Sequence, residues 1–92
     1  MSADEFFEID IQQQADLHYR WTLSRRGVVV TQGVEPYIAS CVAQASVGVH
    51  PTALIAVGID GVPAGSFVAV RAQLESTQVA LEMAEAMLTR QV

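Results

Sequence analysis

The sequence contains no lysine, and its five arginines are outnumbered by ten acidic residues, which gives a net charge of −5 at pH 7. A surface that binds duplex nucleic acid neutralises several phosphates with Lys and Arg. An anionic membrane surface likewise attracts polybasic segments. We therefore expect neither nucleic acid nor a membrane as a partner. The missing lysine also excludes Schiff-base chemistry and a lysine nucleophile.

Cysteine occurs once, at Cys41, so the chain cannot form an internal disulfide. This is compatible with a reducing compartment. No window approaches the ~18 apolar residues of a membrane span. Residues 1–5 are acidic, whereas a secretory signal begins with a basic region and an apolar run. These features predict a cytoplasmic protein.

Side chains that could bind a metal or catalyse a reaction are few. The two histidines, His18 and His50, have no Cys, His, Asp or Glu at a recognised ligand spacing. Cys41 lies on the expected buried stripe of a helix, where a thiol behaves as a small hydrophobic group. The glycines form neither a dinucleotide-binding nor a phosphate-binding motif. We predict no metal site, no cofactor and no catalytic residue, and we expect a non-enzymatic protein.

The composition is that of a folded domain. Apolar residues make up 51% of the chain and charged residues 16%, unlike the polar, charge-rich composition of disordered chains. Ninety-two residues fit one core, because two smaller cores would each bury too little surface. We predict a single domain over residues 1–92.

Alternating apolar and polar residues predict strands at the start of the chain. The first covers residues 6–12. In the next, Leu17, Tyr19, Trp21 and Leu23 share one face. The β-branched run 28–31 follows Arg25-Arg26-Gly27, so residues 17–32 are expected to form a hairpin. The two arginines at its tip could hold an anionic group or lie in a solvated turn.

A helix is predicted over residues 36–47. Pro36 suits the first turn of a helix, where its missing N–H is not needed. Four apolar residues then follow the spacing of one buried stripe, namely Ile38, Cys41, Val42 and Ala45. Gly48 and Pro51 end the helix.

The second half of the chain is more apolar. Residues 53–59 predict a strand that is buried on both faces or lies at a subunit contact. Because Pro63 and Gly65 follow Asp60-Gly61, we expect a loop over 60–65 and a strand over 66–74.

The chain is expected to close with a helix over residues 79–90. Ser76 or Thr77 can cap it, and most of its residues are strong helix formers. Its apolar stripe comprises Val79, Met83, Ala86 and Met87.

Together these elements follow the order strand, strand, strand, helix, strand, strand, helix. Hairpin-connected strands with intervening helices favour an α+β fold. We predict an antiparallel sheet of about five strands with two helices packed on one face.

Four segments of residues 6–47 occur in a recognisable order. They are Phe7-Glu8-Ile9, Tyr19-Arg20-Trp21-Thr22-Leu23, Gly27-Val28-Val29-Val30 and Gly33-x-x-x-Tyr37. This part of the chain resembles the small YegP-like α/β domain. The resemblance implies two strands, a third strand and a helix in that order. It implies no activity and no site, because the family has none established.

Two hypotheses describe the function. The apolar residues of the second half alternate poorly, and a small domain has little core in which to bury both faces of a strand. The first hypothesis is therefore a protein-interaction module that acts as a homodimer or binds another protein. The second is a small-molecule binding protein whose apolar pocket is lined by the second hairpin and the last helix.

The residues expected at this partner or ligand surface are Tyr19, Trp21, Phe67, Val70, Met83 and Met87. For the two aromatic residues of the second strand, core packing is the simpler alternative.

Overall fold

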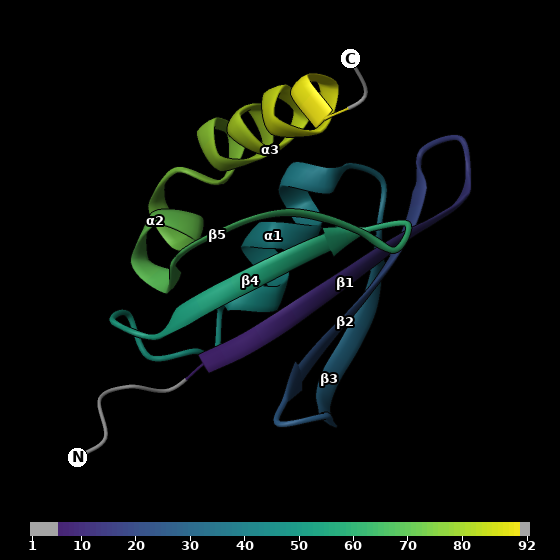
Figure 1. The fold of residues 1–92 in the computed structure, drawn as a ribbon. Coiled ribbons are helices and arrows are strands. Elements are labelled where there is room, and N and C mark those ends of the chain that lie inside the picture. The colour runs from purple at the N-terminus through teal and green to yellow at the C-terminus, as the bar shows by residue number, and fades with distance from the viewer. Residues whose placement is uncertain (1–5, 91–92) are drawn as a thin grey trace.

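The computed structural model describes residues 6–90, which form a five-stranded sheet with a layer of helices on one face (Figure 1). The strands are β1 (Phe6–Ala15), β2 (His18–Arg25), β3 (Val28–Glu35), β4 (Leu54–Ile59) and β5 (Val62–Val68). The helices are α1 (Ile38–Ser46), α2 (Ala69–Leu74) and α3 (Ser76–Arg90). Among the described residues, no helix is both long and apolar enough to cross a membrane.

The sheet has the order β3-β2-β1-β4-β5 and is mixed. Its hairpin pairs are antiparallel, whereas β1 and β4 are parallel, with Phe7 opposite Ile55 and Ile11 opposite Ile59. The α+β class and the five strands are as predicted, but a purely antiparallel sheet was wrong. The connection through α1 crosses the face of the sheet, so β4 enters beside β1 in the same direction.

Strand β1 lies at the centre of the sheet. Apolar and polar residues alternate along it, and the apolar ones mark its buried face. Phe7, Ile9 and Ile11 are at most 7% exposed, while Glu8 and Asp10 between them face solvent. A half-buried strand with one face under helices produces this pattern. The predicted strand is therefore confirmed, and it continues beyond residue 12 to Ala15.

The alternation of β2 is also confirmed, except at its start. Trp21 and Leu23 are buried and Tyr19 is half-buried on the same face. Leu17, however, lies in the turn before the strand, with φ of +54° and a 63% exposed side chain.

Helix α1 buries the stripe that its spacing predicts. Cys41, Val42 and Ala45 are at most 1% exposed, and Ile38 packs against the same core. The helix begins two residues later than predicted, after Pro36 and Tyr37. Beyond its C-terminal end, the Gln73 amide donates hydrogen bonds to the carbonyls of Ser46 (2.8 Å) and Val49 (3.0 Å).

The largest differences from the predicted elements follow β4. The expected loop over 60–65 is a two-residue turn, with φ of +51° at Asp60 and +81° at Gly61. Both central residues of a type I′ turn need positive φ, which Asp-Gly supplies readily. The Asp60 carboxylate also accepts a hydrogen bond from the Gln13 N–H at the end of β1 (3.1 Å). Strand β5 therefore starts at Val62 and includes Pro63.

The predicted strand over 66–74 was wrong in its second part, where the chain forms α2. The backbone N–H groups that begin this helix donate to carbonyls far away in sequence. Ala69 N–H bonds to Ala53 (2.8 Å) and Val70 N–H to Pro51 (3.0 Å). These partners satisfy donors that a helix leaves unpaired at its start.

The final helix α3 agrees with the prediction and starts at Ser76. Val79 and Met83 are at most 3% exposed, and Met87 packs half-buried against the core. The Arg71 guanidinium donates to both carboxylate oxygens of Glu82, at 3.1 and 2.8 Å, and so joins α2 to α3.

Candidate functional site

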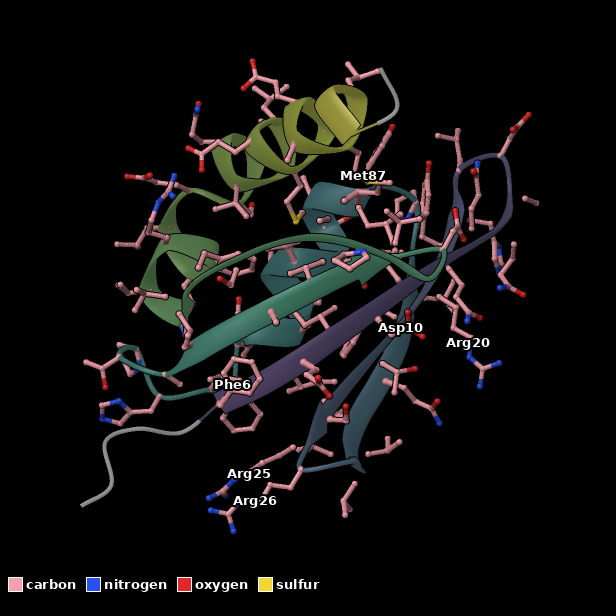
Figure 2. All side chains as sticks on the ribbon, in the orientation of Figure 1. Phe6, Asp10, Arg20, Arg25, Arg26 and Met87 are labelled. Carbon is pink, nitrogen blue, oxygen red and sulfur yellow. The ribbon has the colours of Figure 1, made fainter. Side chains whose placement is uncertain are left out.

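The six residues predicted at a partner or ligand surface lie mostly in the core. Trp21, Phe67 and Met83 are at most 7% exposed. Tyr19 and Met87 are half-buried against the same cluster, and in Figure 2 Met87 extends from α3 toward the interior. Val70 is the most exposed of the six, at 37%. These residues hold the helices to the sheet and do not form one shared surface.

Trp21 has an unusual setting within that core. It pairs across the strands with Gly33, and its indole lies over that glycine. A Cβ atom on Gly33 would lie 2.7 Å from Cζ2, 2.8 Å from Cε2 and 2.9 Å from Nε1 of the ring. The indole Nε1 is buried and has no hydrogen-bond partner among the described residues. Glycine at position 33 is thus required by the close approach of the ring.

The outermost strand β3 exposes several apolar side chains. Val28, Val29, Val30 and Val34 are between 52% and 67% exposed. Glu35 is the only charged residue of the strand. β3 pairs with β2 on one side, and no strand among residues 6–90 pairs with its other side. A row of backbone N–H and C=O groups therefore faces outward.

Charges of opposite sign lie at the two ends of this edge. Arg25 and Arg26 are at the turn between β2 and β3, and Figure 2 shows both projecting from that turn. The guanidinium of Arg25 also lies 5.9 Å from the centre of the Phe7 ring. At the opposite end, Glu35 ends β3 opposite Tyr19 of β2, and Asp16 lies in the turn between β1 and β2.

The second edge of the sheet, β5, is less regular. Pro63 has no N–H to donate, and Gly65 has φ of +134°. The register moves from Val57–Gly65 to Gly58–Pro63, which leaves Ala64 without a partner residue on β4. The backbone of β5 is therefore a poor template for another strand. β3 also has a register shift, near Val30, but it contains no proline and no residue with positive φ.

Two of the hollows in the described part of the chain lie away from the β3 edge. One, of about 340 Å³, lies on the uncovered face of the sheet, between the carboxylates of Glu8 and Asp10 and the small residues Ala56 and Gly58. The other, of about 190 Å³, lies between β5 and α3 and includes Phe67 among its lining residues.

The structure offers little chemistry for catalysis or metal binding. Burial, and secondarily the negative charge of Glu35, raises the pKa of the Cys41 thiol to about 11. A thiol with so high a pKa is a poor nucleophile near neutral pH. Within residues 6–90, no three His, Cys, Asp or Glu side chains lie close enough together to hold a metal ion. The ring of His50 is engaged by the neighbouring Thr52, whose Oγ1 lies 2.9 Å from Nδ1.

Sequence reasoning identified β3 as a strand but missed it as a surface. The signal was present in three consecutive valines with no lysine or proline beside them. Its meaning depends on the order of the strands, which places β3 at the edge of the sheet.

Comparison with protein-family models, with curated proteins and with solved structures finds no match for this chain.

Proposed function

We propose that this chain is a non-enzymatic protein-interaction module that forms a homodimer by pairing its β3 edge with the β3 edge of a second copy. The two sheets would join into one continuous sheet, with the helices of both copies on the same face. A two-fold axis perpendicular to the sheet relates the copies, so the interface is closed and self-complementary.

The exposed edge of β3 is the observation that supports this proposal. Proteins usually protect an edge strand with lysine, proline or an inward-pointing charge. β3 has none of these over its first seven residues, and its exposed side chains there include four valines. Its register shift between Leu23 and Ser24 of β2 falls near Val30 and leaves residues 31–35 regularly paired. Pairing with a second copy would satisfy the outward backbone groups and cover these valines.

The distribution of charge along the β3 edge favours a second copy of this chain as the partner, even though each copy carries a net charge of −5. In an antiparallel pair the Arg25–Arg26 end of each copy lies beside the Asp16 and Glu35 end of the other. Such an arrangement steers association and fixes the direction of pairing more than it adds affinity. Since a single edge strand forms a small interface, we expect a dissociation constant of roughly micromolar order.

The alternative, a small-molecule binding protein, is less well supported. The hollow between β5 and α3, where the sequence suggested a pocket, has about 190 Å³. Typical ligand pockets have roughly 300–1,000 Å³. Phe67 and Met83, which were expected to line a pocket, do line this hollow, but each is at most 7% exposed.

Light scattering coupled to size exclusion, across a range of concentrations, tests the dimer. We expect the wild-type mass to rise from one to two chains, and Val30→Lys to stay monomeric because it adds a charge to the edge. Leu81→Lys on α3 is a matched control, since Leu81 is 57% exposed and Val30 55%. It should dimerise as the wild type does. The proposal is contradicted if the wild-type protein stays monomeric at high concentration. It is also contradicted if Val30→Lys and Leu81→Lys weaken dimer formation equally.

A further inference from the structure

Strand β3 is regular along only part of its length, and that part limits how two copies can pair. The register with β2 shifts near Val30, which has no partner residue on that strand. A bulge of this kind bends the strand and disrupts its ladder of hydrogen bonds. Throughout residues 31–35, by contrast, each residue has a partner on β2. This stretch is therefore the part of the edge that a second strand can pair with regularly.

An antiparallel pair of identical strands is defined by the residue at its two-fold axis. Directly opposite residues share one face of the sheet, so the axis passes between two copies of the same residue. When that residue is Gly33, the pair uses all of residues 31–35. When the axis lies one residue earlier or later, the pair uses only residues 31–33 or 33–35, because the remaining residues lie opposite the bulge or beyond the end of β3.

The backbone groups that face outward favour the register about Gly33. Alternate residues of an edge strand point their N–H and C=O groups away from the sheet, and opposite residues of this set exchange two hydrogen bonds. If the groups of Thr31, Gly33 and Glu35 face outward, the register about Gly33 forms about six hydrogen bonds and each neighbouring register about four. If those of Gln32 and Val34 do, the numbers are about four and about two. The register about Gly33 gains about two hydrogen bonds in both cases.

The side chains on the helix-covered face fit the same register. Thr31, Gly33 and Glu35 lie on this face, because they pair with the core-facing residues of β2. With the axis at Gly33, the Glu35 carboxylate of each copy lies opposite the partner's Thr31, whose hydroxyl can donate a hydrogen bond to it. Opposite Cβ atoms are about 4.5–5.5 Å apart, a distance that a glutamate side chain spans. Within residues 6–90 neither side chain forms a hydrogen bond or an ion pair.

Charge repulsion also separates the possible registers. Glu35 is the only charged residue of β3. With the axis at Gly33, the two Glu35 carboxylates are about 14 Å apart along the strands, which exceeds the ~8 Å Debye length at physiological salt. With the axis at Val34 they are about 7 Å apart along the strands and repel each other more strongly. With the axis at Glu35 itself they are directly opposite, which destabilises a strand pair.

We infer that the homodimer pairs its β3 strands about Gly33, so that Glu35 lies opposite the partner's Thr31 and Gln32 opposite the partner's Val34. This inference rests on the proposed dimer and adds the register of its interface. Glu35 is then a positioning residue, because its charge disfavours the registers that bring two carboxylates together. The backbone of residues 31–35 provides the affinity, and Thr31 and Glu35 select the alignment.

Disulfide mapping observes the register directly. Opposite residues of an antiparallel pair have Cα atoms about 4.5 or 5.5 Å apart, within the ~4.4–6.8 Å that a disulfide spans. A mixture of Thr31→Cys and Glu35→Cys should therefore give, under mild oxidation, a cross-linked dimer with one chain of each kind, which mass spectrometry identifies. Neither variant alone should cross-link, because identical positions lie about 14 Å apart along the strands. The wild type is the control and should not cross-link, since its thiol at Cys41 is buried.

The neighbouring registers give different cross-links. Gln32→Cys alone cross-links if the strands pair about Gln32, and Val34→Cys alone cross-links if they pair about Val34. Either result, or no mixed product of Thr31→Cys and Glu35→Cys while light scattering reports a dimer, overturns the register about Gly33 and leaves the dimer intact. A wild type that stays monomeric at high concentration refutes the proposed function, and this inference with it.

A charge swap tests the contact between positions 31 and 35. Thr31→Glu places a carboxylate opposite the partner's Glu35, and two such pairs should raise the dimer dissociation constant about twofold to thirtyfold. Adding Glu35→Arg to Thr31→Glu should restore the affinity, because each new carboxylate then faces an arginine. Thr77→Glu, at an exposed position of α3, adds the same charge away from the edge and should leave the affinity unchanged. The inference is overturned if Glu35→Arg does not restore the affinity, or if Thr77→Glu weakens the dimer as much as Thr31→Glu.

Discussion

Alanine at position 33 would place a methyl group where the Trp21 indole now lies. The added Cβ would be 2.7 Å from Cζ2 of the ring, whereas carbon atoms in contact normally stay about 3.5–4.0 Å apart. The indole would have to move by roughly 1 Å to restore that separation. Trp21 is only 6% exposed and packs in the main core cluster, so its ring cannot simply turn into solvent.

The expected cost of Gly33→Ala is about 2 kcal/mol of unfolding free energy, within the ~1–3 kcal/mol typical of overpacked cores. For a domain of this size, this corresponds to a melting temperature lower by about 8–16 °C. The loss arises from the contact with Trp21, because the backbone at Gly33 does not require positive φ.

Thermal unfolding followed by far-ultraviolet circular dichroism measures this effect, since tryptophan fluorescence would itself change with the substitution. The protein should be dilute, so that dimer formation does not contribute to the melting temperature. Gly58→Ala is the control, because it is also a strand glycine without positive φ, and its nearest neighbour would be the Val62 carbonyl at an ordinary 3.7 Å. Gly58→Ala should stabilise the fold by about 0.4–1 kcal/mol, because alanine lowers the conformational entropy of the unfolded chain.

A double-mutant cycle with Trp21→Phe shows whether the indole is the cause. Phenylalanine lacks the fused second ring of the indole, so alanine at position 33 should cost less in that background than in the wild type. The reasoning is refuted if Gly33→Ala melts with or above the wild type. It is also refuted if the cost of alanine is the same whether residue 21 is Trp or Phe.

Two further predictions concern titratable side chains. The hydrogen bond from Arg71 holds the pKa of Glu82 below its usual value of 4.5, so its contribution to stability is present above pH 4.5 and is lost as the pH falls through the lowered value. Glu82→Gln should therefore lose less stability than the wild type on acidification below pH 4.5, and equal losses in urea titrations would contradict this. Because burial raises the pKa of Cys41 to about 11, iodoacetamide near pH 8 should label the folded protein far more slowly than the protein in urea, as mass spectrometry can follow. Equal labelling rates would show that the thiol is accessible.

The spacing of apolar residues along the sequence was enough to predict the elements that bury one face and expose the other. The alternation of β1 and the stripe of α1 each identify the buried side chains directly, and both agree with the observed exposures. The final helix agrees for the same reason, since Val79 and Met83 follow helical spacing and both are buried.

The segment after β4 could not be resolved in this way, because long-range contacts decide it. Residues 69–74 begin as a helix where the carbonyls of Pro51 and Ala53 accept the first N–H groups. These acceptors lie about sixteen to nineteen positions earlier, and no local pattern predicts that they will be near. Val68 and Val70 add β propensity to the same stretch, which favoured the strand interpretation.

The same limit applies to the apolar excess of the second half of the chain, because its exposure depends on the order of the strands. The run over 53–59 seemed too apolar for one buried face, which suggested a subunit contact on the second hairpin. In the structure β4 is an interior strand, so its backbone is paired on both sides, and its uncovered face carries the small residues Ala56 and Gly58. Leu54 on that face, and Val62 and Val68 of β5, are 38–42% exposed, so the second hairpin keeps some apolar surface.

The valines of β3 are a different case, because they combine exposed apolar side chains with an unpaired backbone. Either feature alone is common on protein surfaces. Together, on a strand protected by neither lysine nor proline, they describe an edge that gains both hydrogen bonds and apolar burial from another strand. Backbone groups and apolar side chains thus both lack a partner on one side of β3, and this coincidence is the reason for proposing that a second copy pairs there.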